Sequence, residues 1–273
     1  MSGNLPVGGA KYSVDQAPPV STALLLAAGA GTRLNFGAEA EATPKCLVEV
    51  GGVSILERLV SNLGAHGIRR LVIVTGYMEK RIRDVVSQIT GDIEIETINN
   101  PDYATTNNIY SLWLAREQVR ESFLLVESDL VFERDLLRGM LTPDKAAVSK
   151  ILPWMNGTTV GLDSQQKVES FDLTGLLSIQ NRYKTVNLYC LSLDRWNSII
   201  SRLEEHISTG RTGSYYEVVF AEMVDENDLK FEAVVFPSDR WYEIDTYSDR
   251  EAASQLLTSW PLINSADKEM LAN

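Results

Sequence analysis

The sequence predicts an α/β fold: a Rossmann-like, mainly parallel sheet with helices on both faces, plus a small antiparallel lobe. Two observations predict it. Apolar runs at residues 24–26, 70–75, 93–98 and 123–127 alternate with segments of helical spacing, as in β–α–β units. After about residue 146 short strands follow one another with turns between them, which indicates antiparallel pairing. Ligands of parallel sheets collect at the carboxyl ends of the strands, so we expect a site there.

The elements of the first half follow from local patterns. Leu24 to Leu26 form an apolar run that stops at glycine, which suits a strand buried on both faces. Residues 54–57 (Ser-Ile-Leu-Glu) have the spacing of a capping box, and apolar residues then recur at helical spacing. Further helices are expected over residues 80–89 and 109–119.

The second half mixes short strands with longer helices. Strands are expected over residues 146–151, 158–162, 167–171, 185–191 and 231–236, and helices over residues 193–208 and 215–224. Residues 210–213 (Gly-Arg-Thr-Gly) are predicted as a flexible loop. A final helix is expected to be capped at Ser248, where Ser-Asp-Arg-Glu has the capping spacing, and to end near residue 259.

The domain organisation follows from composition. The chain has 273 residues, enough for one large core. Residues 1–20 are rich in Gly, Pro and Ser and are expected to form a disordered lead-in, while residues 261–273 are expected to form a loose tail. We therefore predict a single domain over residues 21–260, with the antiparallel lobe inserted at about 146–192.

Charge and cysteine content bound the function. The net charge of −12 argues against nucleic acid as a partner, because a phosphate backbone needs a basic surface. No apolar run is long enough to span a bilayer, and no secretory signal pattern is found, so we expect a cytoplasmic protein without a membrane partner. Cys46 and Cys190 lie in apolar runs and are expected to be buried thiols.

The most strongly patterned stretch follows the first strand. Residues 27–31 (Ala-Ala-Gly-Ala-Gly) carry little side-chain bulk, so backbone N–H groups can approach a ligand closely. Arg33 and Lys45 place two cations just beyond this loop, as a triphosphate would require. The structural alternative is a tight turn. The stretch matches neither the Walker A loop nor the dinucleotide fingerprint.

Two aspartates are candidates for holding a metal ion. Asp129 ends the apolar strand of residues 123–127, and Asp245 ends another apolar–acidic run. A carboxylate at the carboxyl end of a buried strand is well placed for Mg²⁺, which prefers one or two carboxylates plus phosphate oxygens. The alternatives are a helix cap at Asp129 and a turn or cap at Asp245.

The order of the glycine loop, Lys45, Asp129 and Asp245 resembles that of the nucleotidyltransferases that activate sugar phosphates and small phospho-alcohols, which have a GT-A-like fold. The resemblance implies that the loop wraps the nucleotide through Leu26, Ala27, Ala28, Gly29, Gly31 and Thr32. It also implies catalytic contacts of Arg33 and Lys45 with the phosphates, and an Mg²⁺ cofactor held by Asp129 and Asp245. A homodimer is common in this family.

The run Asn107-Asn-Ile-Tyr-Ser111 resembles a segment of the cytidylyltransferases for choline phosphate and for 2-aminoethylphosphonate. The resemblance implies nucleotide contacts for Asn100, Asn107, Asn108, Ser111 and Ser128. Amide and hydroxyl groups can read the hydrogen-bonding edge of cytosine. The alternative for this run is capping of the helix that follows.

Three later runs, around residues 154–158, 183–187 and 215–217, resemble the phosphonate-activating branch. They imply acceptor contacts for Tyr110, Trp154, Asn156, Lys184, Tyr216 and Glu217, although such aromatic residues are more often core. Two departures stand out. Residues 35–42 are acidic where relatives are shorter, and we expect a mobile lid there. Asn156 stands where an aspartate is expected in the aminoethylphosphonate enzymes.

The sequence therefore predicts an Mg²⁺-dependent cytidylyltransferase that transfers CMP from CTP to a small phosphonate, either 2-aminoethylphosphonate or a phosphonoformate-like acid. Choline phosphate is the alternative acceptor. A uridylyl-, thymidylyl- or guanylyltransferase acting on a sugar phosphate is the alternative enzyme. The alternative of another class is a catalytically silent nucleotide-binding regulator.

Overall fold

The computed structural model describes residues 18–31, 43–153, 155–175 and 181–260. Several predictions lie outside these residues. They concern Thr32, Arg33, Trp154, the acidic loop at 35–42, most of the lead-in and the tail at 261–273.

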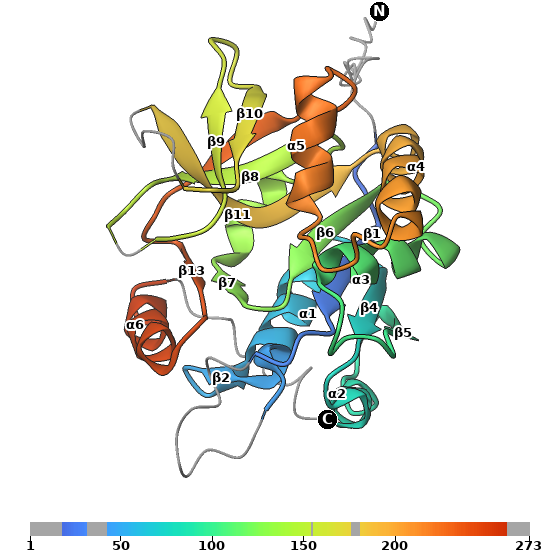
Figure 1. Cartoon of the computed structure of the whole chain (residues 1–273). Coiled ribbons are helices and arrows are strands. Elements are labelled where there is room, and N and C mark those ends of the chain that lie inside the picture. The colour runs from blue at the N-terminus through green and yellow to red at the C-terminus, as the bar shows by residue number, and fades with distance from the viewer. Residues whose placement is uncertain (1–17, 32–42, 154, 176–180, 261–273) are drawn as a thin grey trace, which may run out of the picture.

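A central sheet organises the molecule, as predicted. Within the described residues nine strands form it, in the order β10-β9-β11-β6-β1-β4-β5, with β8 paired to β11 and β12 paired to β8. The strands β6, β1, β4 and β5 run parallel, and β11 joins β6 in the antiparallel sense. Two small antiparallel sheets, β13-β7 and β2-β3, complete the mixed α/β fold (Figure 1).

The strands are β1 (Thr22–Ala27), β2 (Glu49–Val50), β3 (Val53–Ser54), β4 (Arg70–Thr75), β5 (Glu94–Asn99), β6 (Phe123–Glu127), β7 (Leu130–Phe132), β8 (Lys145–Lys150), β9 (Thr159–Leu162), β10 (Val168–Asp172), β11 (Arg182–Leu191), β12 (Glu232–Phe236) and β13 (Trp241–Glu243). The helices are α1 (Ile55–Ala65), α2 (Glu79–Val86), α3 (Asn108–Leu114), α4 (Leu193–Ser208), α5 (Glu217–Asp225) and α6 (Tyr247–Leu257). Short 3-10 helices are η2 (Lys45–Leu47), η3 (Ala115–Glu117) and η4 (Arg134–Gly139).

Both faces of the sheet are covered, and β1 shows why. Its side chains alternate: Ala23 and Leu25 join a core cluster with residues of α1 and α2, while Leu24 and Leu26 join a second cluster with residues of α3, α4 and α5. Successive side chains of a strand point to opposite faces, so a strand between two helical layers must be apolar throughout. The continuous apolar run in the sequence is therefore explained.

Most element boundaries agree with the sequence, and α1 begins with the predicted capping box. The Ser54 hydroxyl accepts from the Glu57 N–H, and the Glu57 carboxylate accepts from the Ser54 N–H. The predicted cap at Ser248 is wrong. The residue that caps α6 is Thr246, which forms a capping box with Asp249, because the Asp249 carboxylate reaches back to the Thr246 N–H.

The strands expected as an inserted lobe, β8 to β11, hydrogen-bond into the same sheet as the parallel strands. Strand β11 starts at Arg182, before the expected residue 185, because it pairs with β8 and β9 on its two sides. Cys46 and Cys190 are free and buried, as predicted, and burial raises the pKa of each thiol to about 12. Among the described residues, no helix combines the length and apolar character needed to cross a membrane.

Candidate active site

A cavity of about 520 Å³ opens at the carboxyl ends of the parallel strands. A first wall comes from the strand ends and loops after β1, β5 and β6 together with α3. A second wall comes from the strands and loops between β8 and β11, from α5 and its preceding loop, and from β13. The lining residues are Leu26, Ala28, Gly29, Gly31, Lys45, Asn100, Tyr103, Thr106, Asn107, Asn108, Ser111, Glu127, Ser128, Asp129, Asn156, Gly157, Thr158, Leu173, Lys184, Asn187, Tyr215, Glu217, Glu243 and Asp245.

The glycine loop after β1 forms part of the first wall. The Ala28 carbonyl accepts a hydrogen bond of 3.0 Å from the Tyr77 N–H, which ties the loop to the chain after β4. Gly31 has a φ of +55°, and a Cβ there would lie 2.7 Å from Lys45 Cγ. Both the left-handed backbone and this close approach require glycine. Gly31 therefore lets the stem of Lys45 lie directly against the loop.

Lys45 bridges the two candidate aspartates. Its Nζ lies 2.9 Å from Asp129 Oδ2 and 2.7 Å from Asp245 Oδ1. Burial alone would lower the pKa of Lys45, but the charges of Asp129 and Asp245 outweigh it, so the pKa lies above its ordinary value of 10.5. The lysine therefore stays protonated. The structure thus brings together three residues that are up to 200 positions apart in sequence.

One oxygen of the aspartate pair lacks a hydrogen-bond partner among the described residues. Asp129 Oδ1 is buried and accepts no hydrogen bond from the described residues. A buried carboxylate oxygen without a donor is costly, and a bound cation would satisfy it. Among the described residues no group of three or more His, Cys, Asp or Glu side chains has the arrangement of a metal site. Two carboxylates fit an ion that takes its other ligands from phosphate oxygens and water.

The predicted amides of the first wall already have protein partners. The Asn100 side chain donates to Ser111 Oγ at 3.1 Å and accepts from the Asp102 N–H at 2.9 Å. The Asn107 carboxamide accepts from the Asn108 N–H at 2.8 Å, which caps α3 as the alternative interpretation predicted. These amides therefore shape the wall, and only part of their hydrogen-bonding capacity remains for a ligand.

The second wall contains a buried ion pair. Lys184 is 2% exposed, and its Nζ donates to the Thr185 carbonyl at 2.7 Å and lies 3.3 Å from Glu243 Oε2. Removal from water raises the pKa of Glu243, and the charge of Lys184 opposes that shift. The ionic partner of Lys184 is thus Glu243, a side chain of the protein itself.

Two further carboxyl groups face the same space. Burial raises the pKa of Glu217 from its ordinary value of 4.5 to about 7, although Lys184 opposes the shift. The buried Glu217 Oε2 has no hydrogen-bond partner among the described residues. Desolvation also raises the pKa of Glu127 well above its ordinary value, and the charges of Asp129 and Glu217 add to it. With Glu243 and Glu217 on the second wall and Glu127 on the first, the cavity therefore holds more acid groups than Lys184 can neutralise.

Among the described residues, three predicted site residues do not line the cavity. The Ala27 side chain packs into the core on the α1 face, because β1 alternates. Tyr216 is fully buried against Tyr189 and Phe220, so the aromatic that reaches the cavity is its neighbour Tyr215. Tyr110 packs on Trp113 and donates to Asp102 Oδ2 at 3.4 Å, away from the lining.

The site predictions omitted Glu243, Tyr215 and Asn187. A repeated pattern could have indicated Glu243, because Glu127-Ser-Asp129 and Glu243-Ile-Asp245 share the same spacing. Residues two apart on a strand share a face, so each glutamate points to the same side as the aspartate two positions later, which is the side of the cavity. No sequence signal indicates that Asn187 adopts a φ of +57° where β11 changes its register against β8.

Known proteins share both sequence and fold with this chain. Residues 23–259 match the family model of the MobA-like NTP transferase domain. A CMP-5'-(3-aminopropyl)phosphonate synthase of Streptomyces rubellomurinus is 29% identical over 89% of this chain and 39% of its own length. A choline-phosphate cytidylyltransferase of Streptococcus pneumoniae is 33% identical over 44% of this chain and 49% of its own length. The chain thus aligns with less than half the length of each of these two relatives.

The solved structure of the CTP:phosphocholine cytidylyltransferase from Streptococcus pneumoniae superposes with a TM-score of 0.73. It covers 87% of this chain and 100% of that one, at 21% identity. The inositol-1-phosphate CTP transferase from T. maritima superposes with a TM-score of 0.71 over 90% of this chain and 100% of that one, at 20% identity. These likenesses establish the fold. Independently of these structures, the family match over residues 23–259 shows that the chain belongs to the MobA-like NTP transferase domain family.

Proposed function

We propose that this protein is a cytidylyltransferase that transfers CMP from CTP to a small phosphonate bearing an amino group. The main support for nucleotidyl transfer is the position of the Lys45 ammonium, which lies between Asp129 and Asp245 beside the glycine loop. The choice of CTP rests on the relatives, which are named as a CMP-phosphonate synthase and as cytidylyltransferases. The choice of acceptor rests on the charges of the second wall.

The reaction joins one phosphonate oxygen to the α-phosphorus of CTP. That oxygen carries a negative charge at neutral pH and attacks without a general base. A P–O bond forms to the α-phosphorus, the bond to the β-phosphate oxygen breaks, and pyrophosphate leaves with the electron pair. Such transfer depends mainly on positioning and charge stabilisation. Lys45 would stabilise charge on the α-phosphate, and the glycine loop would supply backbone N–H donors.

Mg²⁺ is the proposed cofactor, with Asp129 and Asp245 as its protein ligands. When bound, it would act as a Lewis acid toward phosphate oxygens of the nucleotide. The orphaned Asp129 Oδ1 supports this assignment. Because Lys45 occupies both carboxylates in the absence of a ligand, we expect tight metal binding to require the nucleotide, whose phosphates would attract the ammonium.

The acceptor assignment follows from a charge count. The second wall places Glu243 and Glu217 beside Lys184, and Glu127 of the first wall lines the same cavity, so acid groups outnumber this lysine. A small acidic phosphonate would need a free cation there, whereas Lys184 is already paired with Glu243. An ammonium group would instead give Glu217 Oε2 the donor that it lacks. The charges therefore favour an aminoalkylphosphonate over a phosphonoformate-like acid.

Choline phosphate is less well supported. A quaternary ammonium cannot donate a hydrogen bond to Glu217 and is usually bound by an aromatic cage. The two tyrosines predicted as acceptor contacts, Tyr216 and Tyr110, lie off the cavity. Among the described tyrosines Tyr103 lines the first wall and Tyr215 the second.

A panel of nucleoside triphosphates tests the reaction. With 2-aminoethylphosphonate as acceptor, pyrophosphate release should be fastest with CTP. Faster release with UTP, dTTP or GTP would reject the cytidylyl assignment. CTP binding without pyrophosphate release for any acceptor, including sugar phosphates, would instead identify a nucleotide-binding regulator.

A further inference from the structure

Asn108 joins three elements through one side chain. Its Oδ1 accepts a hydrogen bond of 3.0 Å from the Tyr216 N–H at the start of α5, and its Nδ2 donates to Glu127 Oε1 on β6 at 3.1 Å. Asn108 itself is the first residue of α3. The carboxamide thus ties the first wall to the helix that carries Glu217, and both of its ends are engaged by the protein.

The bond to Tyr216 replaces a cap that α5 lacks. Tyr216 is the N-cap residue of α5 and makes no side-chain capping bond of its own. The N–H groups at a helix start have no partner within the helix and need one from outside. Asn108 supplies an acceptor from α3. A second tie lies next to it, where the Asn107 N–H donates to the Thr212 carbonyl at 2.9 Å.

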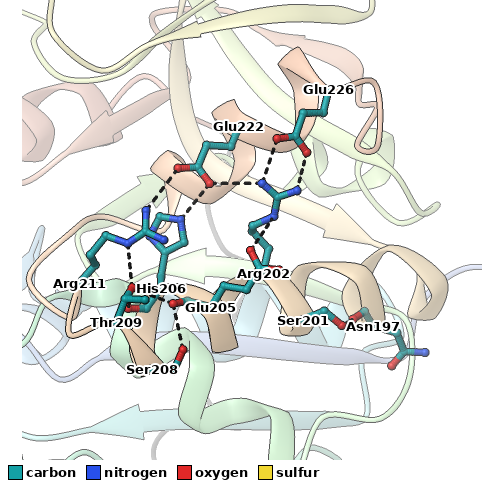
Figure 2. Close-up of polar contacts among 10 residues, drawn as sticks. All are labelled: Asn197, Ser201, Arg202, Glu205, His206, Ser208, Thr209, Arg211, Glu222 and Glu226. Atoms are coloured by element: carbon teal, nitrogen blue, oxygen red, sulfur yellow. Dashed lines mark hydrogen bonds and ion pairs between the residues drawn. The ribbon is translucent and has the colours of Figure 1, made fainter.

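The rest of α5 is anchored elsewhere. Figure 2 shows Glu222 in the middle of α5 with three cationic or imidazole groups around it. His206 Nε2 lies 2.9 Å from Glu222 Oε2, Arg202 Nη1 lies 3.6 Å from the same oxygen, and Arg211 Nη1 lies 3.9 Å from Oε1. These contacts fix the body of α5 on α4. The loop before α5, which borders the cavity, is held instead by the hydrogen bonds of Asn107 and Asn108.

We propose that Asn108 is a positioning residue for the acceptor, which fixes Tyr215 and Glu217 on one side and Glu127 on the other. This inference rests on the proposed function and deepens it, because it assigns to the acceptor an asparagine that the sequence alone assigns to the nucleotide. Asn108 touches no reacting atom in this account. It acts by holding the carboxyl groups that would receive the ammonium of the acceptor.

Kinetics and binding separate the two roles. Asn108→Ala should raise the KM for 2-aminoethylphosphonate about tenfold, as expected for the loss of a hydrogen bond to a carboxylate. The Kd for CTP, measured by calorimetry, should stay within about twofold of the wild type. A weakened CTP affinity with an unchanged acceptor KM would overturn the proposal and indicate that Asn108 contacts the nucleotide.

The matched control is Asn62→Ala. Asn62 is also a buried asparagine, and its Nδ2 donates to the Phe132 carbonyl at 3.2 Å, but it does not line the cavity. This variant loses a comparable buried hydrogen bond and should keep the acceptor KM of the wild type. If Asn62→Ala raises that KM as much as Asn108→Ala does, the effect is a general loss of stability and the positioning role is wrong.

Hydrogen exchange tests the contact without any turnover. Peptides covering residues 212–217 should exchange about tenfold faster in Asn108→Ala than in the wild type or in Asn62→Ala. Asn108→Asp keeps the oxygen that accepts from Tyr216 and should restore slow exchange. Unchanged exchange in Asn108→Ala would overturn the proposal even if CTP and the acceptor react. If the wild type shows no transfer while exchange behaves as expected, the proposed function fails and the contact stands.

Discussion

The first wall of the cavity presents backbone groups and side-chain amides that have protein partners, whereas the second wall presents a carboxylate with one oxygen that lacks a hydrogen-bond partner among the described residues. Asn100, Asn107 and Asn108 are held by hydrogen bonds, and the glycine loop is tied down through Tyr77. Glu217 is buried with an orphaned oxygen, and its pKa is raised to about 7. The polar groups of the first wall are thus fixed in place before a ligand binds, whereas the second wall has a carboxyl group that could bind a cationic ligand.

The two walls therefore suit different parts of the reaction, the first the shared nucleotide and the second the acceptor. A preformed polar wall suits a ligand common to a whole family, because its geometry needs no adjustment. Ionised carboxyl groups buried in a wall are costly in the free protein, and either a proton or a bound cation relieves that cost. We therefore expect substitutions in the cluster of Lys45, Asp129 and Asp245 to impair the reaction most. Substitutions in the second wall should change the choice of acceptor.

The largest effect is expected in the cluster that contains Lys45, at Asp129. Asp129→Ala should lower kcat by about 10³-fold, corresponding to about 4 kcal/mol of lost transition-state stabilisation, because Lys45 and the proposed Mg²⁺ both lose a ligand. Asp245→Asn should lower kcat less, because one oxygen remains as a ligand. Calorimetry should show CTP-dependent Mg²⁺ binding in the wild type and none in Asp129→Ala. Equal Mg²⁺ binding with and without CTP would count against a shared site.

Lys45→Ala should follow, with a loss of about 10²-fold in kcat from the removal of one transition-state donor. The control is Lys80→Ala, because Lys80 is exposed on α2 and does not line the cavity. Steady-state kinetics on both variants, with circular dichroism to verify folding, decides the matter. Turnover of Lys45→Ala near that of Lys80→Ala would remove Lys45 from the mechanism.

In the second wall, Glu217→Gln should change stability with pH. Between pH 4.5 and 7 the folded chain keeps a proton on Glu217 that the unfolded chain has released, so stability falls as the pH rises through this window. Above pH 7 the variant should therefore be more stable than the wild type, by about 3 kcal/mol at most, and the two should be equal at pH 4.

Urea unfolding of both proteins at pH 4, 6 and 8 measures this difference. Glu94→Gln provides the control, because Glu94 is exposed on β5 and lies outside the cavity. A Glu217→Gln variant that is less stable than the wild type at pH 8 would show that a favourable partner already satisfies the ionised carboxylate.

The smallest effect is expected at the exposed rim. Asn156 lines the cavity but is exposed, so a charge there is screened by solvent. Asn156→Asp should shift kcat/KM toward the amino-bearing acceptor by about threefold, measured with 2-aminoethylphosphonate against phosphonoformate. A much larger shift would place the selecting charge at the rim and not at Glu217.

Sequence and structure agree best where local rules decide the outcome. The apolar run of β1, the capping box at Ser54 and the strand over Arg70–Thr75 were predictable because periodicity and capping act over a few residues. The cap of α6 was misplaced because two overlapping patterns compete, and Asp249 reaches back to Thr246 in preference to the Ser248 pattern.

The candidate site divides in the same way. Lys45, Asp129 and Asp245 could be anticipated, because glycine loops and strand-end carboxylates have recognisable sequence patterns. The orientation of Tyr215 rather than Tyr216 toward the cavity depends on how α5 packs against the core. The pairing of Lys184 with Glu243 joins residues that are far apart in sequence. Such contacts are set by tertiary packing, which no local pattern reports.

We expect the acid groups of the second wall to select an acceptor with an ammonium group. A competition of 2-aminoethylphosphonate, choline phosphate and phosphonoformate for CTP, in the wild type and in Glu217→Gln, tests it most directly. We predict the highest kcat/KM for 2-aminoethylphosphonate in the wild type, with its advantage reduced about tenfold in Glu217→Gln. A wild-type preference for phosphonoformate or choline phosphate, or a preference that Glu217→Gln leaves unchanged, would contradict the account.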